Sequence, residues 1–282
     1  MKKGLVMEGG AMRGMFTAGI LDVFMENGIE FDGAVGVSAG ATFGCNIKSK
    51  QPGRSIRYNI KYCKDPRYGT FKSWIKTGDL YESKFCYETL PFELDPFDVK
   101  TFAANPLEFY CVVTDAKSGK PVYHRCKTGT GKDMDWIRAS ASMPLVSKLV
   151  KIDEGYYSDG GAADSIPLKF FESKGFDKNV VILTRDRDYK KKPDKFAWLY
   201  KILMPQYPGL AKAMANRPKM YNAEKLYIEK REKEGKAFLI FPPKEIDISR
   251  TEHDPKELQR IYDMGRKTAL EKLEDIRKYL AG

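Results

Sequence analysis

The stretch Gly36-Val37-Ser38-Ala39-Gly40 decides how this chain is interpreted. Residues 31–37 are apolar and predict a short β-strand, while residues 39–48 have the apolar spacing of a helix. A serine between glycines on such a strand–turn–helix connection holds its hydroxyl above the edge of the sheet. This context is typical of a catalytic nucleophile. A small-residue turn that lets the helix pack closely on the sheet is the alternative for the pentapeptide alone.

The rest of the chain alternates strands with helices around this connection. Strands are predicted at residues 3–7, 107–116, 121–125, 149–152, 155–158, 179–184 and 237–241, and helices at 15–27, 133–142, 167–174 and 256–280. Such alternation predicts a three-layer α/β/α sandwich with a mostly parallel central sheet. We expect one domain over residues 1–282, with a motif-bearing core at about 3–185 and a C-terminal strand and helices in 186–282.

Length and composition suit a globular protein. Of the 282 residues, 42% are hydrophobic and 31% are charged, and no apolar run approaches the ~20 residues that span a bilayer. The apolar start of the chain is soon interrupted by Glu8 and two glycines, so we expect a first strand, no signal peptide and a cytoplasmic protein. The five scattered cysteines include no C-x-x-C pair, which favours reduced, buried thiols over disulfides or a zinc knuckle.

A net charge of +11 favours anionic partners such as phospholipid head groups, nucleic acid or acidic substrates. The one basic triplet, Lys190-Lys191-Lys192, is either solvated surface or a contact with an anionic membrane. We find no nucleic-acid-binding motif and expect no nucleic-acid partner.

A second glycine-rich segment, Glu8-Gly9-Gly10-Ala11-Met12-Arg13-Gly14, follows the first strand and precedes a helix. Such a loop exposes backbone N–H groups in a concave nest that binds a phosphate or an oxyanion. Ala11 breaks the G-x-G-x-x-G nucleotide pattern, and Asp133 breaks a P-loop at residues 129–133. An oxyanion hole formed by Gly9, Gly10, Ala11, Met12, Arg13 and Gly14 fits better, because the serine turn comes on the next strand.

The general base is the third element of the site. The chain has two histidines, His124 and His253, and we expect both at the surface rather than in catalysis. Asp159 stands at the end of a strand, before Gly160 and Gly161, where its carboxylate could accept the Ser38 proton directly. An ordinary Asx turn is the alternative for this Asp-Gly pair.

These three motifs, in this order, resemble the patatin-like phospholipases, in particular their bacterial branch. Residues 138–145 (Arg-Ala-Ser-Ala-Ser-Met-Pro-Leu) and the Ile166-Pro167 pair resemble the family as well. The resemblance covers about the first two-thirds of the chain and implies a patatin-like fold.

The resemblance implies a Ser38–Asp159 catalytic dyad without histidine, supported by the motif glycines Gly36, Gly40, Gly160 and Gly161. It implies lipid acyl esters as substrates, with no metal or cofactor. The chain departs from the commonest family pattern at Glu8, where Asp is frequent, and at Ala11, where Gly is frequent.

Two other functions remain open from the sequence alone. One is a Ser–His–acid esterase of the α/β-hydrolase type that uses His253. The other is a non-catalytic protein that binds anionic lipid or phosphate through the glycine nest and the basic surface, with Ser38 merely structural. The sequence also leaves open a peripheral contact of the protein with an anionic membrane. Residues 196–214, apolar and interrupted by Pro205 and Pro208, are interpreted either as a mobile lid or as a kinked helix packed on the sheet.

Overall fold

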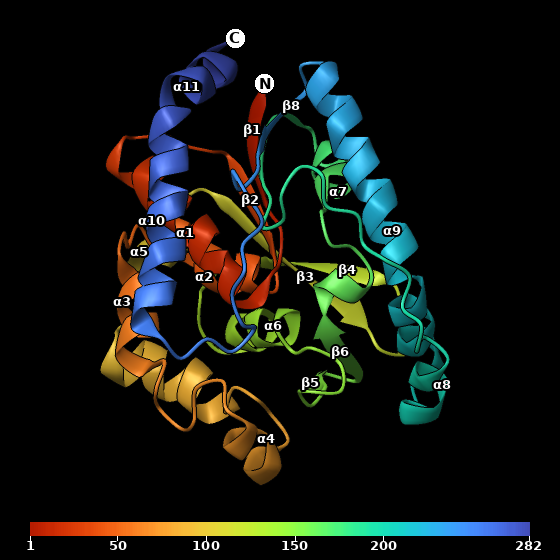
Figure 1. Ribbon diagram of the computed structural model, residues 1–282. Helices are drawn as coiled ribbons and strands as arrows, with labels where there is room; N and C mark the ends of the chain where they lie inside the picture. Colours follow the sequence, from red (N-terminus) through yellow and green to blue (C-terminus); the bar gives the residue numbers. More distant parts are fainter.

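The computed structural model describes all residues, 1–282, and has one central sheet of eight strands (Figure 1). The strands follow the spatial order β5-β6-β3-β2-β1-β7-β8, and β4 pairs with β3. Their bounds are β1 Lys2–Met7, β2 Gly33–Val37, β3 Glu108–Asp115, β4 Pro121–Cys126, β5 Val150–Ile152, β6 Gly155–Asp159, β7 Phe176–Ile182 and β8 Ala237–Ile240.

Five of the strands, β3, β2, β1, β7 and β8, run parallel, and β4, β5 and β6 pair antiparallel. Met7 at the end of β1 pairs with Gly36 near the end of β2. The loops after these two strands therefore leave the sheet side by side at its carboxyl edge, which is where open parallel sheets bind ligands.

Helices cover both faces of the sheet, as the predicted three-layer sandwich requires. Alternate residues of β1 point to opposite faces: Leu5 and Met7 join one buried cluster and Val6 joins another. Helices α1, α2, α3, α10 and α11 contribute to the first cluster, and α7 and α9 to the second.

The α-helices are α1 Gly14–Glu26, α2 Ala39–Lys48, α3 Arg54–Tyr62, α4 Phe71–Thr77, α5 Val99–Ala104, α6 Lys132–Ser140, α7 Leu168–Ser173, α8 Leu199–Leu203, α9 Pro208–Lys233, α10 Pro255–Glu271 and α11 Leu273–Ala281. Two 3₁₀ turns, η1 Ala11–Arg13 and η3 Gly160–Ala162, and a π-helix, η2 Phe85–Leu94, complete the elements. No helix combines the length and the apolar composition that crossing a membrane requires.

The N-terminal helix α1 and the late helix α10 cross at very short range (Figure 1). A Cβ added to Gly19 of α1 would lie 2.1 Å from the carbonyl oxygen of Tyr262, and one added to Gly265 of α10 would lie 2.1 Å from that of Phe16. Both glycines are thus needed for the two backbones to touch. The contact places residues from both ends of the chain in one hydrophobic core.

One expectation about the last third of the chain was wrong, and the choice between a lid and a kinked helix at residues 196–214 stays a prediction. Residues 256–280 were expected as one helix but form α10 and α11, which break at Lys272 (φ −102°, ψ 1°). Residues 196–214 were expected as a lid or a kinked helix on the sheet. They form the short helix α8, which buries no residue, and then the start of the long helix α9, which was not predicted as a whole. Proline at the first turn of α9 suits a helix start, because that N–H needs no partner.

Candidate active site

Ser38 occupies a strained turn between β2 and α2. Its φ of 55° is one that residues other than glycine rarely adopt, and its side chain is largely buried. A Cβ at Gly36 would lie 2.2 Å from the carbonyl oxygen of Gly40, and a Cβ at Gly40 would lie 2.4 Å from that of Met7. The two motif glycines are therefore required by close backbone approach, and the predicted strand–turn–helix arrangement is present.

The glycine-rich loop passes directly against this turn. A Cβ on Gly9 would lie 2.8 Å from the Cβ of Ser38. The N–H groups of Gly9 and Gly10 donate no hydrogen bond within the protein, so both are free to bind an oxyanion. Ala11 has a φ of 49°, which explains why glycine would suit this position, and it begins the turn η1 that leads through Arg13 into α1 at Gly14.

Glu8 anchors the base of the loop. Its side chain is buried and accepts a hydrogen bond from the N–H of Thr184 at 2.7 Å, while the Thr184 hydroxyl donates to the carbonyl oxygen of Gly9 at 2.8 Å. The longer side chain of Glu8 is thus accommodated by the segment that follows β7.

Asp159 ends β6 and is buried beside Ser38. Its Oδ1 accepts a hydrogen bond from the Gly161 N–H at 2.8 Å, so the alternative Asx turn is also present, but it occupies only one carboxylate oxygen. Burial raises the pKa of Asp159, and hydrogen bonding to the Ser38 hydroxyl and the positive charge of Arg217 partly oppose that rise. A carboxylate with a raised pKa beside a hydroxyl is equipped to accept a proton.

Residues 138–145, which the sequence offered without a role, tie the serine turn to the Asp159 strand. The N–H of Ser38 donates to the Ser140 hydroxyl at 3.0 Å. The carbonyl oxygen of Ser142 accepts from the N–H of Asp159 at 2.9 Å and from the Ser158 hydroxyl at 2.7 Å. This segment therefore fixes the positions of both residues.

Both histidines lie away from Ser38, and neither lines a cavity that Ser38 lines. His253 Nδ1 makes a short hydrogen bond to the carbonyl oxygen of Cys63. His124 is half-buried rather than fully at the surface: it bonds Asp133 at 2.9 Å and stacks on Trp136.

One cluster has the atom types of a metal site, namely His124, Cys126 and Asp133, whose ligand atoms lie within 4.8 Å of one another. Asp133 Oδ2 already accepts backbone N–H bonds from residues 127, 128 and 129. Burial raises the pKa of Asp133, but the hydrogen bonds from His124, Thr128 and Gly129 outweigh burial and lower that pKa to about 2. Hydrogen bonding accounts for this cluster, so we assign it no ligand.

Two cavities meet at Ser38. The first is lined by 25 residues, of which 16 are hydrophobic. It extends from Ser38 past Phe43, Tyr58, Tyr87 and Leu90. Of the 22 residues that line the second cavity, 9 are hydrophobic, and its wall includes Asp159 and most of the glycine-rich loop. Ala11, Ser38 and Met143 line both cavities.

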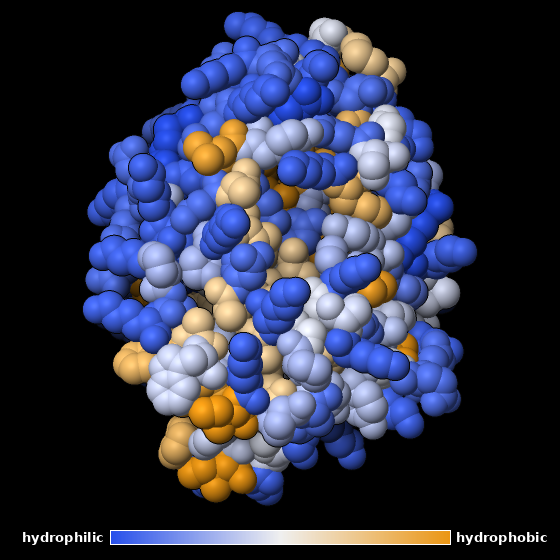
Figure 2. Space-filling model, turned by 90° about the vertical axis from the view of Figure 1, so that its right-hand side faces the viewer, coloured by the Kyte–Doolittle hydropathy of each residue, from blue (hydrophilic) through white to orange (hydrophobic).

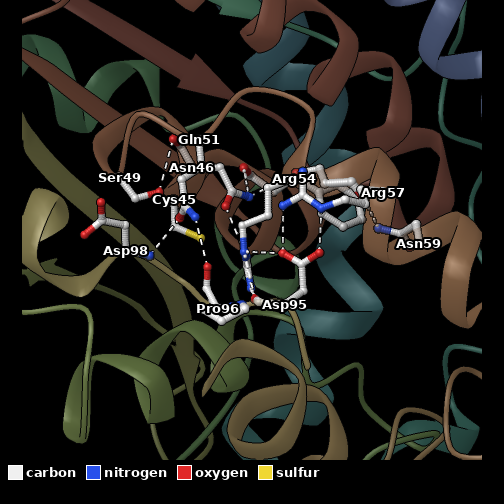
Figure 3. Close-up of polar contacts among 12 residues, drawn as sticks. Cys45, Asn46, Ser49, Gln51, Arg54, Arg57, Asn59, Asp95, Pro96 and Asp98 are labelled. Carbon is white, nitrogen blue, oxygen red and sulfur yellow. Dashed lines mark hydrogen bonds and ion pairs between the residues drawn. The ribbon is translucent and has the colours of Figure 1, made fainter. Parts of the chain in front are cut away.

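Arg54, which lines the apolar cavity, belongs to an ion-pair network (Figure 3). Arg54 lines that cavity and lies 3.2 Å from the carboxylate of Asp95, which Arg57 also contacts at 2.7 Å. Arg54 further bonds the side chain of Asn46 at 3.1 Å. These contacts join α2 and α3 to the segment after η2.

Arg217 is a residue of the site that sequence reasoning missed. Its Nε donates to the carbonyl oxygen of Gly161 at 2.6 Å, and it lines the second cavity beside Asp159. It lies on α9, in a stretch that carries no recognisable motif, so no local signal could have pointed to it.

The family model described as "Patatin-like phospholipase" matches residues 5–171, and one described as "Domain of unknown function (DUF6363)" matches residues 207–281. The first match covers more than half of the chain. The chain therefore belongs to the patatin-like phospholipase family, as its motifs predicted, and this membership supports a lipid acyl hydrolase activity in general terms.

The chain is also similar to individual proteins. The uncharacterized protein YjjU of Escherichia coli (strain K12) is 27% identical over 273 residues, covering 93% of this chain and 74% of that protein. Lysophospholipase nte1 of Aspergillus terreus is 28% identical over 192 residues, which are 62% of this chain but only 11% of that much longer protein. The solved structure of VipD from Legionella pneumophila matches with a TM-score of 0.48 at 14% identity, over 97% of this chain and 67% of that one.

Proposed function

We propose that the protein is a serine hydrolase that cleaves the acyl esters of lipids through a Ser38–Asp159 dyad. The observation that carries the proposal is the position of Ser38: a strained turn places it where two cavities meet, with the buried carboxyl of Asp159 beside its hydroxyl. The apolar cavity suits an acyl chain, and the polar cavity suits the remainder of the ester.

The dyad would act in two stages. Ser38 Oγ attacks the ester carbonyl carbon while the carboxylate of Asp159 takes the hydroxyl proton, and the N–H groups of Gly9 and Gly10 stabilise the resulting oxyanion. Collapse of this intermediate breaks the bond to the alcohol, which leaves with the proton from Asp159. A water molecule then gives its proton to Asp159 and attacks the acyl-enzyme, and the fatty acid is released as Ser38 recovers its proton.

Substitution of the two residues tests this proposal. We expect Ser38→Ala and Asp159→Ala each to lower the hydrolysis of p-nitrophenyl butyrate by at least about 10²–10⁴-fold, because a positioned base contributes that much. His253→Ala is the matched control and should retain activity. An inactive His253→Ala protein beside an active Asp159→Ala protein would favour the Ser–His–acid mechanism instead.

A fluorophosphonate probe distinguishes catalysis from binding alone. An activated Ser38 should be labelled in the wild type and not in Ser38→Ala. A folded wild-type protein that escapes labelling would support the non-catalytic lipid-binding alternative.

We also propose a cytoplasmic protein that contacts anionic membranes peripherally. Two helices at the same end of the molecule expose apolar side chains: Phe71 and Ile75 of α4, at 66% and 69%, and Ile202 and Leu203 of α8, at 63% and 53% (Figure 1). Apolar atoms gather at this end in the space-filling view as well (Figure 2). The net charge of +11 suits an anionic bilayer.

Vesicle binding tests this contact. Ile75→Asp and Ile202→Asp should each weaken binding to phosphatidylglycerol vesicles about tenfold, because an inserted isoleucine contributes about 1.5–3 kcal/mol. Leu270→Asp is the control, because it changes an exposed leucine in the last turn of α10, outside α4 and α8. If all three variants bind the vesicles as tightly as the wild type does, the proposed membrane contact is wrong.

A further inference from the structure

The polar cavity beside Ser38 carries an excess of positive charge. Its lining includes five cationic side chains, those of Arg13, Arg185, Lys191, Arg217 and Arg250. The carboxylates in the same lining are those of Glu8 and Asp159. Both are already engaged, Glu8 with the N–H of Thr184 and Asp159 with the N–H of Gly161.

The protein itself does not neutralise this excess. Of the five cations, Arg185 alone forms an ion pair, at 3.3 Å from the largely exposed Glu245. The buried Nε of Arg13 has no hydrogen-bond partner. Burial and the repulsion of Arg185 lower the pKa of Arg13 to about 10. A cavity in which cations outnumber carboxylates and repel one another is complementary to an anion.

The fold places Lys191, and not its two lysine neighbours, in the wall of this cavity. It is the middle residue of the basic triplet, and it lines the cavity while Lys190 and Lys192 are exposed. Asn222 of α9 fixes its backbone through two hydrogen bonds, from the Lys191 N–H at 2.9 Å and to the Lys191 carbonyl at 3.0 Å. Burial and the nearby Arg217 lower the pKa of Lys191 to about 8.

We propose that these five cations form a subsite for the phosphate of a net-anionic head group, carried by the same ester whose acyl bond faces Ser38. The subsite rests on the proposed function and gives it a substrate class: monoacyl or diacyl lipids whose head group ends in an uncompensated phosphate. Guanidinium groups are suited to phosphate because their paired N–H donors match its oxygens.

Zwitterionic head groups fit the cavity poorly. A choline or ethanolamine head group would bring a further positive charge among the five cations. A choline group is commonly held by aromatic faces. Tyr221 offers such a face in this cavity, but the Lys191 ammonium already lies 4.8 Å from the centre of its ring.

Paired lipid substrates test the subsite. The probes are 1-oleoyl lysophosphatidic acid and 1-oleoyl lysophosphatidylcholine, which share the acyl chain and the ester, assayed below the concentration at which they aggregate. We expect the wild type to favour lysophosphatidic acid over lysophosphatidylcholine in kcat/KM by about tenfold or more. Lys191→Gln should lower that ratio about tenfold, because one charge-assisted hydrogen bond is lost.

Lys190→Gln is the matched control, since it removes the same charge from the neighbouring exposed position and should leave the substrate ratio as in the wild type. Arg250→Gln takes the place of Lys191→Gln if that variant does not fold. Equal kcat/KM for the two lipids, unchanged by either substitution, would overturn the subsite and leave the dyad standing. A wild-type protein that does not hydrolyse p-nitrophenyl butyrate would instead overturn the proposed function.

Inorganic phosphate distinguishes the two sources of the anion. A subsite for ester-linked phosphate gives a substrate preference that Lys191→Gln removes. Inorganic phosphate that inhibits the hydrolysis of lysophosphatidylcholine in the wild type but not in Lys191→Gln, with no preference between the two lipids, would assign the cations to free phosphate and overturn the head-group assignment.

Discussion

The two cavities that meet at Ser38 differ in their composition and in where the chain supplies them. The apolar cavity is built from residues 11–147, with side chains such as Phe43, Tyr58 and Leu90. The polar cavity takes part of its wall from the same region, but Lys191, Arg217 and Arg250 come from the last third of the chain. Under the proposed function, this contrast predicts that an ester binds in one orientation, with its acyl chain and its head group on opposite sides of Ser38.

The largest effect should come from the point that both cavities share. Gly9→Ala would place a Cβ 2.8 Å from the Cβ of Ser38 and displace the loop that we propose as the oxyanion hole. We expect kcat to fall by about 10²–10³-fold, the cost of losing one oxyanion donor. The loss should be equal for p-nitrophenyl butyrate and for long-chain lipids, because the carbonyl is common to both. A variant with wild-type thermal stability and full activity would contradict this role of the loop.

A substitution on the apolar side should affect acyl chains alone. Ala141 lines that cavity at the end of α6, and Ala141→Phe fills part of it. Each buried methylene contributes about 0.8 kcal/mol. Losing room for two of them should lower the kcat/KM ratio of p-nitrophenyl dodecanoate to butyrate about tenfold. Ala104→Phe, at an exposed position of α5, is the control. An unchanged ratio in Ala141→Phe would place the acyl chain elsewhere.

The smallest effect concerns pH, on the polar side. Asp159 must be ionised to act as a base, so activity should fall as the pH drops through its pKa, which burial raises above 3.8. Arg217 opposes that rise, so Arg217→Gln should move the acid limb of kcat/KM to higher pH, whereas Arg217→Lys should largely restore it. Lys219→Gln, an exposed cation on the same helix, is the control. An acid limb that stays in place would show that Arg217 only holds the Gly161 carbonyl.

The fold was predictable from the sequence where local pattern and packing agree. Strand β2 and helix α2 were expected within a residue or two, because the apolar spacing there matches one buried strand and one helix. Helix α9 was missed because Pro218 lies inside it and its polar and apolar residues show little helical periodicity. The break at Lys272 follows no glycine or proline, so a continuous helix was the natural expectation.

The candidate site likewise contains residues that local motifs predicted and residues that they did not. Ser38, the loop from Gly9 to Gly14, and Asp159 were found because short motifs carry the backbone geometry that their chemistry requires. Arg217 and Lys191 could not be found, because their positions depend on how α9 and the segment before it lie against the end of the sheet. A charged side chain in a charged sequence gives no local indication that it faces a cavity.

The close crossing of α1 and α10 joins an early and a late part of the chain through direct backbone contact. Gly19 and Gly265 let the backbones touch, so the region matched by the second family model is held against the helix that follows the oxyanion loop. Under the proposed head-group subsite, exchanging the last third of the chain between relatives should change which head group is accepted, while Ser38 and Asp159 stay the same. We expect such a chimaera to fold only if both parent proteins have glycine at the positions of Gly19 and Gly265, because a Cβ at either position would collide with the facing helix.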